Sequence, residues 1–210
     1  MNIIYLLFHG LSPYSGISKK ILHQVKGFEA CGHRVSLCTY SIADNGQRVR
    51  MINNEIIEDY GTGKPAAAKR RVSYQCIYRY AITHQVELIY VRSFHNANPF
   101  TIRLFSKLRK AGIKIAMEIP TYPYDSEYAG FPLVTRLGIQ VDKVFRKTLA
   151  KHVNAIVTFS DYHCIFGQRT IQISNGVDFD SIPLKKTVSK NTSVIHLLGV
   201  AEVHYWHGYD

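Results

Sequence analysis

Short apolar runs alternate with longer amphipathic segments along most of this chain. Residues 2–8 form the first apolar run and predict a buried strand. Residues 17–31 carry apolar side chains at helical spacing, with Gly32 just beyond them as a stop signal, and predict a helix. This alternation is typical of βαβ units. The expected fold class is therefore α/β, with a Rossmann-like, doubly wound parallel sheet.

The same alternation continues to residue 173. Residues 41–64 fit neither the helical nor the strand period, although Asn45-Gly46 marks a turn. Elsewhere, strands are predicted over 34–39, 87–91, 113–118, 155–159 and 170–173, and helices over 66–85, 99–111 and 133–152.

The C-terminal part of the sequence suggests a second domain. Residues 183–193 are rich in Lys, Ser and Thr and predict a linker, and residues 194–200 predict one more strand. A lone strand cannot bury its apolar side chains by itself. We therefore expect a complete domain over residues 1–182, a linker over 183–193, and the start of a truncated second domain over 194–210.

Net charge and cysteine spacing indicate which partners and sites to expect. The net charge is +11, from 26 Lys and Arg against 15 Asp and Glu, and it favours anionic partners such as phosphorylated substrates or membrane surfaces. The basic residues are scattered over several segments and no nucleic-acid-binding motif accompanies them, so no nucleic-acid partner is expected. The four cysteines have no metal-ligand spacing, and no metal site is expected.

The first apolar run bears on localisation. It is short and lacks a preceding basic segment, unlike a signal peptide or a membrane span. A cytoplasmic protein is therefore expected.

Candidate chemistry lies in the loops that follow the predicted strands, because ligands of doubly wound sheets bind beyond the carboxyl ends of the strands. In the first loop, Ser15, Gly16 and Ile17 open a predicted helix, whose N-terminal N–H groups suit a phosphate. The spacing is neither GxGxxG nor a P-loop, which disfavours dinucleotide and P-loop enzymes. An ordinary turn capped by Ser15 is the alternative interpretation.

The loop after residues 113–118 is rich in tyrosine and proline. Tyr122 and Tyr124 offer flat faces and hydroxyls that suit sugars, and Glu118 at the strand end could accept a hydrogen bond or act as a base. Arg92 and His95 follow another strand and are further candidates. The alternative for all five is a structural role in solvated loops.

Four segments together resemble the N-terminal half of GT-B-fold retaining glycosyltransferases, specifically glycosyltransferase family 4. They are the glycine loop at Ser15-Gly16 with the helix that runs into Gly32-His33-Arg34-Val35, the strand over 113–118, Val157-Thr158-Phe159-Ser160, and Ile173-Ser174-Asn175-Gly176-Val177-Asp178. The chain departs from the family in having one glycine in the first loop where many members have two, and Glu118-Ile119-Pro120 where many have a histidine.

The resemblance implies a retaining, hexosyltransferase-type enzyme that moves a sugar from a nucleotide-diphosphate sugar to a saccharide or lipid-linked acceptor, in surface polysaccharide synthesis. Ser15, Gly16 and Ile17 would approach the donor diphosphate, and Glu118, Tyr122, Tyr124, Arg92 and His95 would line the acceptor site. Residues 1–182 would be the acceptor-side domain and 194–210 the start of the donor-binding domain. No metal or other cofactor is implied, and this chain alone would be inactive.

Two further expectations accompany this interpretation. Basic surface residues, including those over 136–151, suit peripheral docking at an anionic inner membrane face. The alternative function is a lone, non-catalytic domain that docks to an anionic membrane or to a partner chain.

Overall fold

The computed structural model describes residues 1–93, 95–124 and 133–176, with Asp178 and Asp180. The chain divides into two compact units, residues 1–177 and 178–210, and every element given below belongs to the first. The predicted linker over 183–193 and strand over 194–200 lie outside the described residues.

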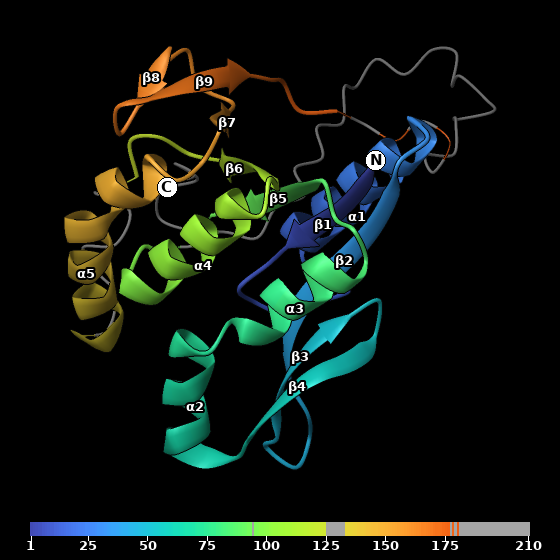
Figure 1. The fold of residues 1–210 in the computed structure, drawn as a ribbon, viewed down its shortest axis with the longest axis vertical. Coiled ribbons are helices and arrows are strands. Elements are labelled where there is room, and N and C mark those ends of the chain that lie inside the picture. Colours follow the sequence, from blue (N-terminus) through green and yellow to red (C-terminus); the bar gives the residue numbers. More distant parts are fainter. Residues whose placement is uncertain (94, 125–132, 177, 179, 181–210) are drawn as a thin grey trace, which may run out of the picture. The chain divides into compact units, whose positions relative to one another are not determined.

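The first unit is built on a nine-stranded sheet in the order β4-β3-β2-β1-β5-β6-β7-β9-β8 (Figure 1). The six strands from β2 to β9 are mutually parallel, whereas β3, β4 and β8 run antiparallel to their neighbours. The strands are β1 (Asn2–Leu6), β2 (Arg34–Ile42), β3 (Arg48–Ile52), β4 (Glu55–Gly61), β5 (Leu88–Arg92), β6 (Lys114–Ile119), β7 (Ala155–Thr158), β8 (Cys164–Ile165) and β9 (Gln168–Gln172).

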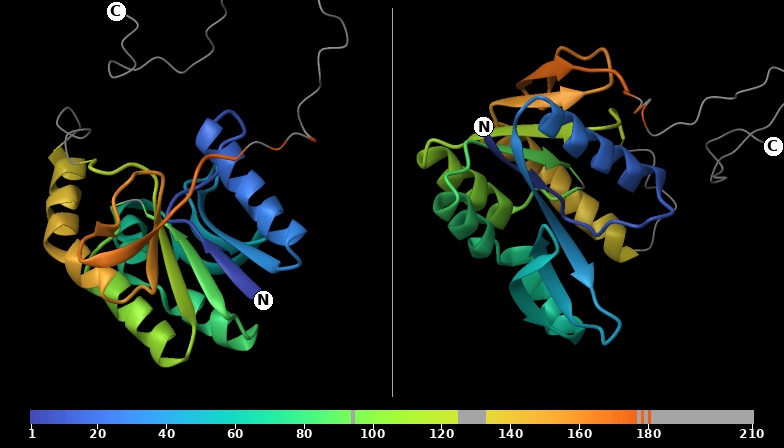
Figure 2. Two further views of the ribbon diagram at one scale, coloured as in Figure 1. Left: turned by 90° about the horizontal axis from the view of Figure 1, so that it is seen from above. Right: turned by 90° about the vertical axis from the view of Figure 1, so that its right-hand side faces the viewer.

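Helices cover both faces of this sheet (Figure 2). One face packs against α1, through Ile21 of the helix and Ile3 and Tyr5 of β1. The other face carries the larger core, which contains residues of α3, α4 and α5. The helices are α1 (Gly16–Ala30), α2 (Gly63–Val72), α3 (Gln75–Thr83), α4 (Pro99–Lys110) and α5 (Leu133–Ala150). The predicted Rossmann-like α/β fold is thus confirmed.

Local sequence explains where the helices begin. Ser15 caps α1, since its side chain accepts a hydrogen bond from Ser18 N. Asn98 and Thr101 form a reciprocal capping box at the start of α4, where Pro99 occupies a position that needs no N–H donor. Among the helices of the described residues, none has both the length and the apolar character needed to cross a bilayer.

Two segments differ from the prediction. The single helix predicted over 66–85 is wrong, because the chain is extended at Ser73, whose carbonyl accepts a hydrogen bond from the Tyr60 hydroxyl. This break separates α2 from α3. The segment without a clear pattern, residues 41–64, forms the antiparallel pair β3 and β4, joined by Asn53 and Asn54 at positive φ.

Candidate functional site

The carboxyl edge of the sheet contains a topological switch point between β1 and β5. The chain leaves β1 toward β2 on one side, while β5 pairs with β1 on the other. In doubly wound proteins, ligands bind beyond the strand ends at such a reversal. The loops after β1, β5, β6 and β7 all leave from this edge, as the sequence predicted.

Arg92 and Glu118 form a buried ion pair at this edge. They are register partners at the ends of β5 and β6, on the face that α1 covers. Arg92 Nη1 donates to Glu118 Oε1, and the two side chains are 7% and 0% exposed. The two residues that sequence analysis placed in separate loops therefore contact each other directly.

Three further side chains complete the network around Glu118. Its Oε2 accepts hydrogen bonds from the Tyr90 hydroxyl at 2.7 Å and from Gln24 Nε2 at 2.9 Å. Gln24, on α1, in turn accepts a hydrogen bond from the Tyr5 hydroxyl at 2.6 Å. Burial, with the nearby Glu118 carboxylate adding to it, raises the pKa of both Tyr5 and Tyr90. Both hydroxyls therefore remain protonated donors at neutral pH.

These contacts make Glu118 a structural residue that holds its neighbours in position. Both of its oxygens are engaged, and no part of its side chain reaches solvent. It fixes Arg92 and holds α1 to the sheet through Gln24. A base needs an oxygen that can reach the proton it removes, so this arrangement does not favour Glu118 as the base. That Glu118 contributes to the binding site of the sugar acceptor stays a prediction.

Lys20 stands beside this network. Its Nζ donates a hydrogen bond to Asn175 Oδ1 at 2.7 Å and lies 3.6 Å from the centroid of the Phe159 ring. Burial lowers its pKa, with the Glu118 carboxylate opposing the shift and the Arg92 guanidinium adding to it. A cation on the first turns of α1 thus meets the Asn-Gly segment that follows β9.

The predicted donor-phosphate residues lie at the start of α1. Ser15 is half-buried by its capping role, whereas Gly16 and Ile17 are exposed. A Cβ built on Gly16 would meet no atom within 4 Å. The N-terminus of α1 therefore has open space above Gly16, one helical turn from Lys20.

The remaining predicted acceptor residues gather on the opposite face of the sheet. The His95 and Tyr124 rings are 4.8 Å apart, and Tyr122 lies 6.4 Å from Tyr124 between ring centroids. The Arg146 guanidinium of α5 stands 4.7 Å from the ring centroid of Phe166, which also contacts Tyr122. The five predicted acceptor residues thus form two groups, Arg92 with Glu118, and His95 with Tyr122 and Tyr124.

Sequence analysis missed several residues of this edge. Tyr5 and Tyr90 lie in segments predicted as strands, Lys20 and Gln24 lie in the helix predicted over 17–31, and none of the four was identified as a site residue. One signal could have found Lys20, since it lies four residues after Gly16 and so on the same helix face.

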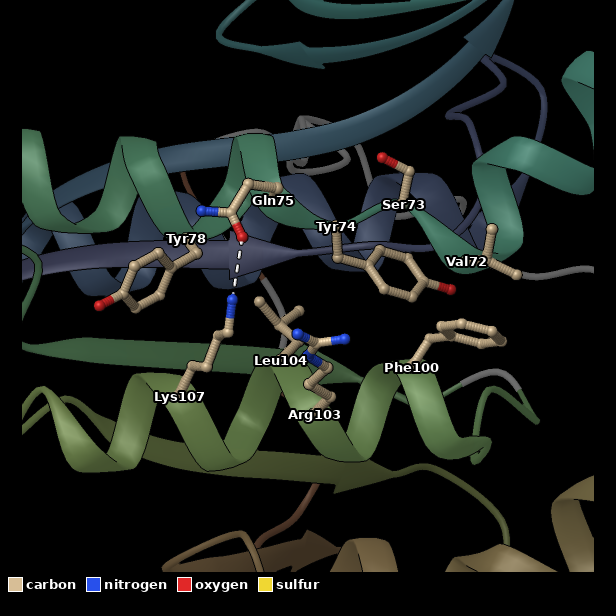
Figure 3. Close-up of a pocket in the computed structure, with 9 residues that line it drawn as sticks. All are labelled: Val72, Ser73, Tyr74, Gln75, Tyr78, Phe100, Arg103, Leu104 and Lys107. Atoms are coloured by element: carbon tan, nitrogen blue, oxygen red, sulfur yellow. Dashed lines mark hydrogen bonds between the residues drawn. The ribbon is translucent and has the colours of Figure 1, made fainter.

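The structure also has a hollow between α3 and α4, with a volume of about 350 Å³ (Figure 3). Aromatic side chains line it with two cations of α4, and Lys107 Nζ donates to Gln75 Oε1 at 3.2 Å across it. None of the predicted site residues lines this hollow. Its lining comprises Val72, Ser73, Tyr74, Gln75, Tyr78, Phe100, Arg103, Leu104 and Lys107.

Across residues 1–93, 95–124 and 133–176, no three His, Cys, Asp or Glu side chains are grouped so that they could hold a metal ion. Comparison with protein-family models, curated protein sequences and solved structures found no match to this chain.

Proposed function

We propose that this chain is the acceptor-side part of a retaining glycosyltransferase that takes its sugar from a nucleotide-diphosphate donor. The hydrogen bond between Lys20 and Asn175 carries the proposal. It joins the helix that follows the first loop to the Asn-Gly segment after β9, two segments 155 positions apart that both contribute to the sequence resemblance. Their contact places both at one end of the sheet.

The geometry suits an anionic leaving group. The first N–H groups of α1 carry partial positive charge, and Lys20 adds a full charge one turn away. A departing diphosphate above Gly16 would be stabilised by both, and stabilising a charge that develops in the transition state is a large catalytic contribution. Arg92, paired with Glu118, would order the acceptor side of the same face without adding net charge to it.

Transfer measured on the native polypeptide tests this proposal. We would purify it from its source cells and supply radiolabelled nucleotide sugars with a panel of saccharide and lipid-linked acceptors. Lys20→Met should lower kcat about tenfold or more, since a charge-assisted contact to the leaving group is lost. Lys19→Met removes an exposed charge from the neighbouring position and should leave kcat unchanged.

Three outcomes would contradict the proposal. The first is absence of labelled product with every donor, and the second is equal activity of the Lys19 and Lys20 variants. The 210-residue chain should bind nucleotide sugars weakly, and a submicromolar dissociation constant in calorimetry would also count against an acceptor-side role.

A second candidate function is docking to an anionic membrane without catalysis. Four apolar side chains of α5 recur at helical spacing and are 46–70% exposed: Leu133, Leu137, Val141 and Val144. Basic residues occupy neighbouring positions of the same helix, including Arg136 and Lys147. An exposed apolar stripe flanked by cations suits the interface of an anionic bilayer.

Vesicle sedimentation tests the second candidate. The chain should sediment with vesicles containing phosphatidylserine and remain in solution with phosphatidylcholine alone. A Leu137→Asp, Val144→Asp double variant should lose this binding, and Ile56→Asp, which changes an exposed residue of β4, should keep it. Equal binding of the double variant and the control would exclude α5 as the docking face.

A further inference from the structure

A cluster of arginines lies where β3 meets α2. Arg48 and Arg50 belong to β3, and Arg70 belongs to the last turn of α2, with Arg71 next to it. Arg48 and Arg70 are half-buried, Arg50 is only 1% exposed, and Arg71 is exposed. We call Arg48, Arg50 and Arg70 the arginine cluster.

Arg50 is held from several sides. Its Nη1 donates to the Leu7 carbonyl at 3.1 Å, and its Nε donates to the Tyr60 hydroxyl at 3.2 Å. Its guanidinium lies 5.9 Å from the ring centroids of both Phe8 and Tyr74. The position of this charge is therefore fixed by packing.

Tyr40 connects the other two arginines. Arg48 Nη1 donates to the Tyr40 hydroxyl at 2.7 Å, while the Arg70 guanidinium stacks over the Tyr40 ring at 4.2 Å. The Nε donors of Arg48 and Arg70 are buried and have no hydrogen-bond partner. Two donors of the cluster thus lack an acceptor.

The cluster also lacks a counter-charge. Among the described residues, the ion pairs involve Arg79 and Arg92 but no member of the arginine cluster. Burial lowers the pKa of Arg70, Tyr40 opposes the shift, and repulsion from Arg71, Arg48 and Arg50 lowers the pKa further. Like charges gathered in this way are stabilised by a bound anion.

The cluster borders the first loop at the ligand-binding edge of the sheet. Tyr40 N donates to His9 O at 3.3 Å, and a Cβ on Gly10 would come within 2.9 Å of Tyr40 O. The Leu7 carbonyl that Arg50 binds belongs to the residue directly after β1. A ligand bound beyond the end of β1 would therefore have the arginine cluster beside it.

We infer that the arginine cluster binds a phosphoryl group of the acceptor. This rests on the proposed function and adds to it that the acceptor is a phosphate ester. Guanidinium groups pair with phosphate oxygens through parallel hydrogen bonds, and a phosphate monoester carries enough charge to neutralise more than one arginine. A carboxylate, with a single charge, would leave the cluster largely uncompensated.

Calorimetry on the 210-residue chain tests this inference. The probes are inorganic pyrophosphate and glucose 6-phosphate, with glucose as the neutral counterpart and glucuronate as the carboxylate counterpart. Both phosphates should bind and glucose should not. An Arg48→Gln, Arg70→Gln double variant should weaken phosphate binding about tenfold or more, since each substitution removes charge-assisted hydrogen bonds.

Two single variants serve as controls. Arg34→Gln changes an exposed arginine at the opposite end of β2, and Arg103→Gln changes a cation of the α3–α4 hollow. Both should bind phosphate as the unchanged chain does. Amide NMR provides a second readout, because pyrophosphate should shift the Gly10 and Tyr40 signals of the unchanged chain even if the double variant fails to fold.

Several results would overturn the inference: unchanged affinity in the double variant, a loss confined to Arg103→Gln, or glucuronate binding as tight as that of glucose 6-phosphate. Failure of this inference is separable from failure of the proposed function. Sugar transfer to a neutral acceptor with no phosphate binding would reject the cluster and keep the transferase. Phosphate binding at the arginine cluster without any sugar transfer would keep the cluster as a phosphate site and reject the transferase.

Discussion

Two arginines are buried at the same edge of the sheet, on opposite faces, in contrasting surroundings. Arg92 faces α1 and is paired with the Glu118 carboxylate, which two further side chains also bind. Arg50 faces the larger core, and its hydrogen bonds go to a carbonyl and a phenol. The charge of Arg92 is neutralised by the Glu118 carboxylate. Among the described residues, the hydrogen-bond partners of Arg50 are neutral groups.

The contrast indicates which of these arginines is available to an anion. A neutralised pair exerts little net attraction, so Arg92 mainly orders its neighbours. Arg50 forms no ion pair among the described residues, so its positive charge is not neutralised, and Arg48 and Arg70 add to it. Burial and position are similar for both arginines, so the counter-charge is what separates a structural arginine from a candidate ligand-binding one.

The largest effect is expected from removing the counter-charge of Arg92. Glu118→Ala leaves a buried guanidinium unpaired and should lower the free energy of unfolding by about 3–5 kcal/mol. Urea denaturation followed by circular dichroism measures the change. Glu58→Ala breaks the ion pair with Arg79, whose side chain is 66% exposed, and should cost less than about 1 kcal/mol. Similar losses in both variants would contradict the neutralised-pair interpretation.

The second effect concerns the Cys38 thiol, which is buried beside Arg50. Burial raises the pKa of this thiol from 9.0 to about 11, although the Arg50 guanidinium opposes the shift. Between these values the unfolded chain releases the proton and the folded chain keeps it, so stability is full below pH 9 and falls as pH rises toward 11. The loss should reach about 3 kcal/mol across this window.

Denaturation midpoints at several pH values measure this decline. Cys38→Ala should flatten the part between pH 9 and 10, where the tyrosines of the unfolded chain are still mostly protonated. Cys31→Ala, at an exposed cysteine, should keep the full decline. A decline that persists unchanged in Cys38→Ala would show that the thiol is not held in an apolar environment.

Arg50→Met tests the other half of the comparison. The substitution removes a buried charge that has no carboxylate partner, and it leaves the Leu7 carbonyl and the Tyr60 hydroxyl without their donor. The loss of these two hydrogen bonds should cost about 1–3 kcal/mol, less than Glu118→Ala. If urea denaturation gives an equal or larger loss than for Glu118→Ala, Arg50 has a stronger internal partner than its contacts indicate.

The sequence predicted the parallel core well for a physical reason. Strands β1, β5 and β6 are buried on both faces, so they read as continuous apolar runs between polar loops. The β3 and β4 pair carries Arg48 and Arg50 and has no such signature. The break between α2 and α3 depends on the Tyr60 hydroxyl, which is distant in sequence and leaves no local signal.

The candidate site was predictable only in part. Arg92 and Glu118 were identified because they lie at the carboxyl ends of predicted strands, where doubly wound sheets bind ligands, yet their pairing needed the β5–β6 register. Lys20 and Asn175, or Arg50 and Tyr60, meet through tertiary packing, which periodicity does not encode. Two members of the arginine cluster, Arg48 and Arg50, lie in the segment 41–64 that had no clear pattern, and Arg70 lies in the helix predicted over 66–85.

The last pair of effects concerns Gly10 and Gly16, and it includes the smallest expected change in stability, at Gly16. Gly10 lies against Tyr40 of the arginine cluster, and a Cβ there would come within 2.9 Å of a backbone oxygen. Gly10→Ala should therefore cost about 1–3 kcal/mol through overpacking. Gly16 begins α1 on the Arg92 side and has open space, so Gly16→Leu should change stability by less than about 0.5 kcal/mol.

The two variants separate folding from function within a single loop. Gly16→Leu fills the space above α1, where the donor diphosphate is proposed to lie, so it should abolish sugar transfer by the native polypeptide while the melting temperature stays near that of the unchanged protein. Gly10→Ala should lower the melting temperature and, because Tyr40 must shift, also weaken pyrophosphate binding at the arginine cluster. Full transfer by Gly16→Leu would remove this loop from the donor site. Unchanged pyrophosphate binding by a destabilised Gly10→Ala would show that Tyr40 does not position the cluster.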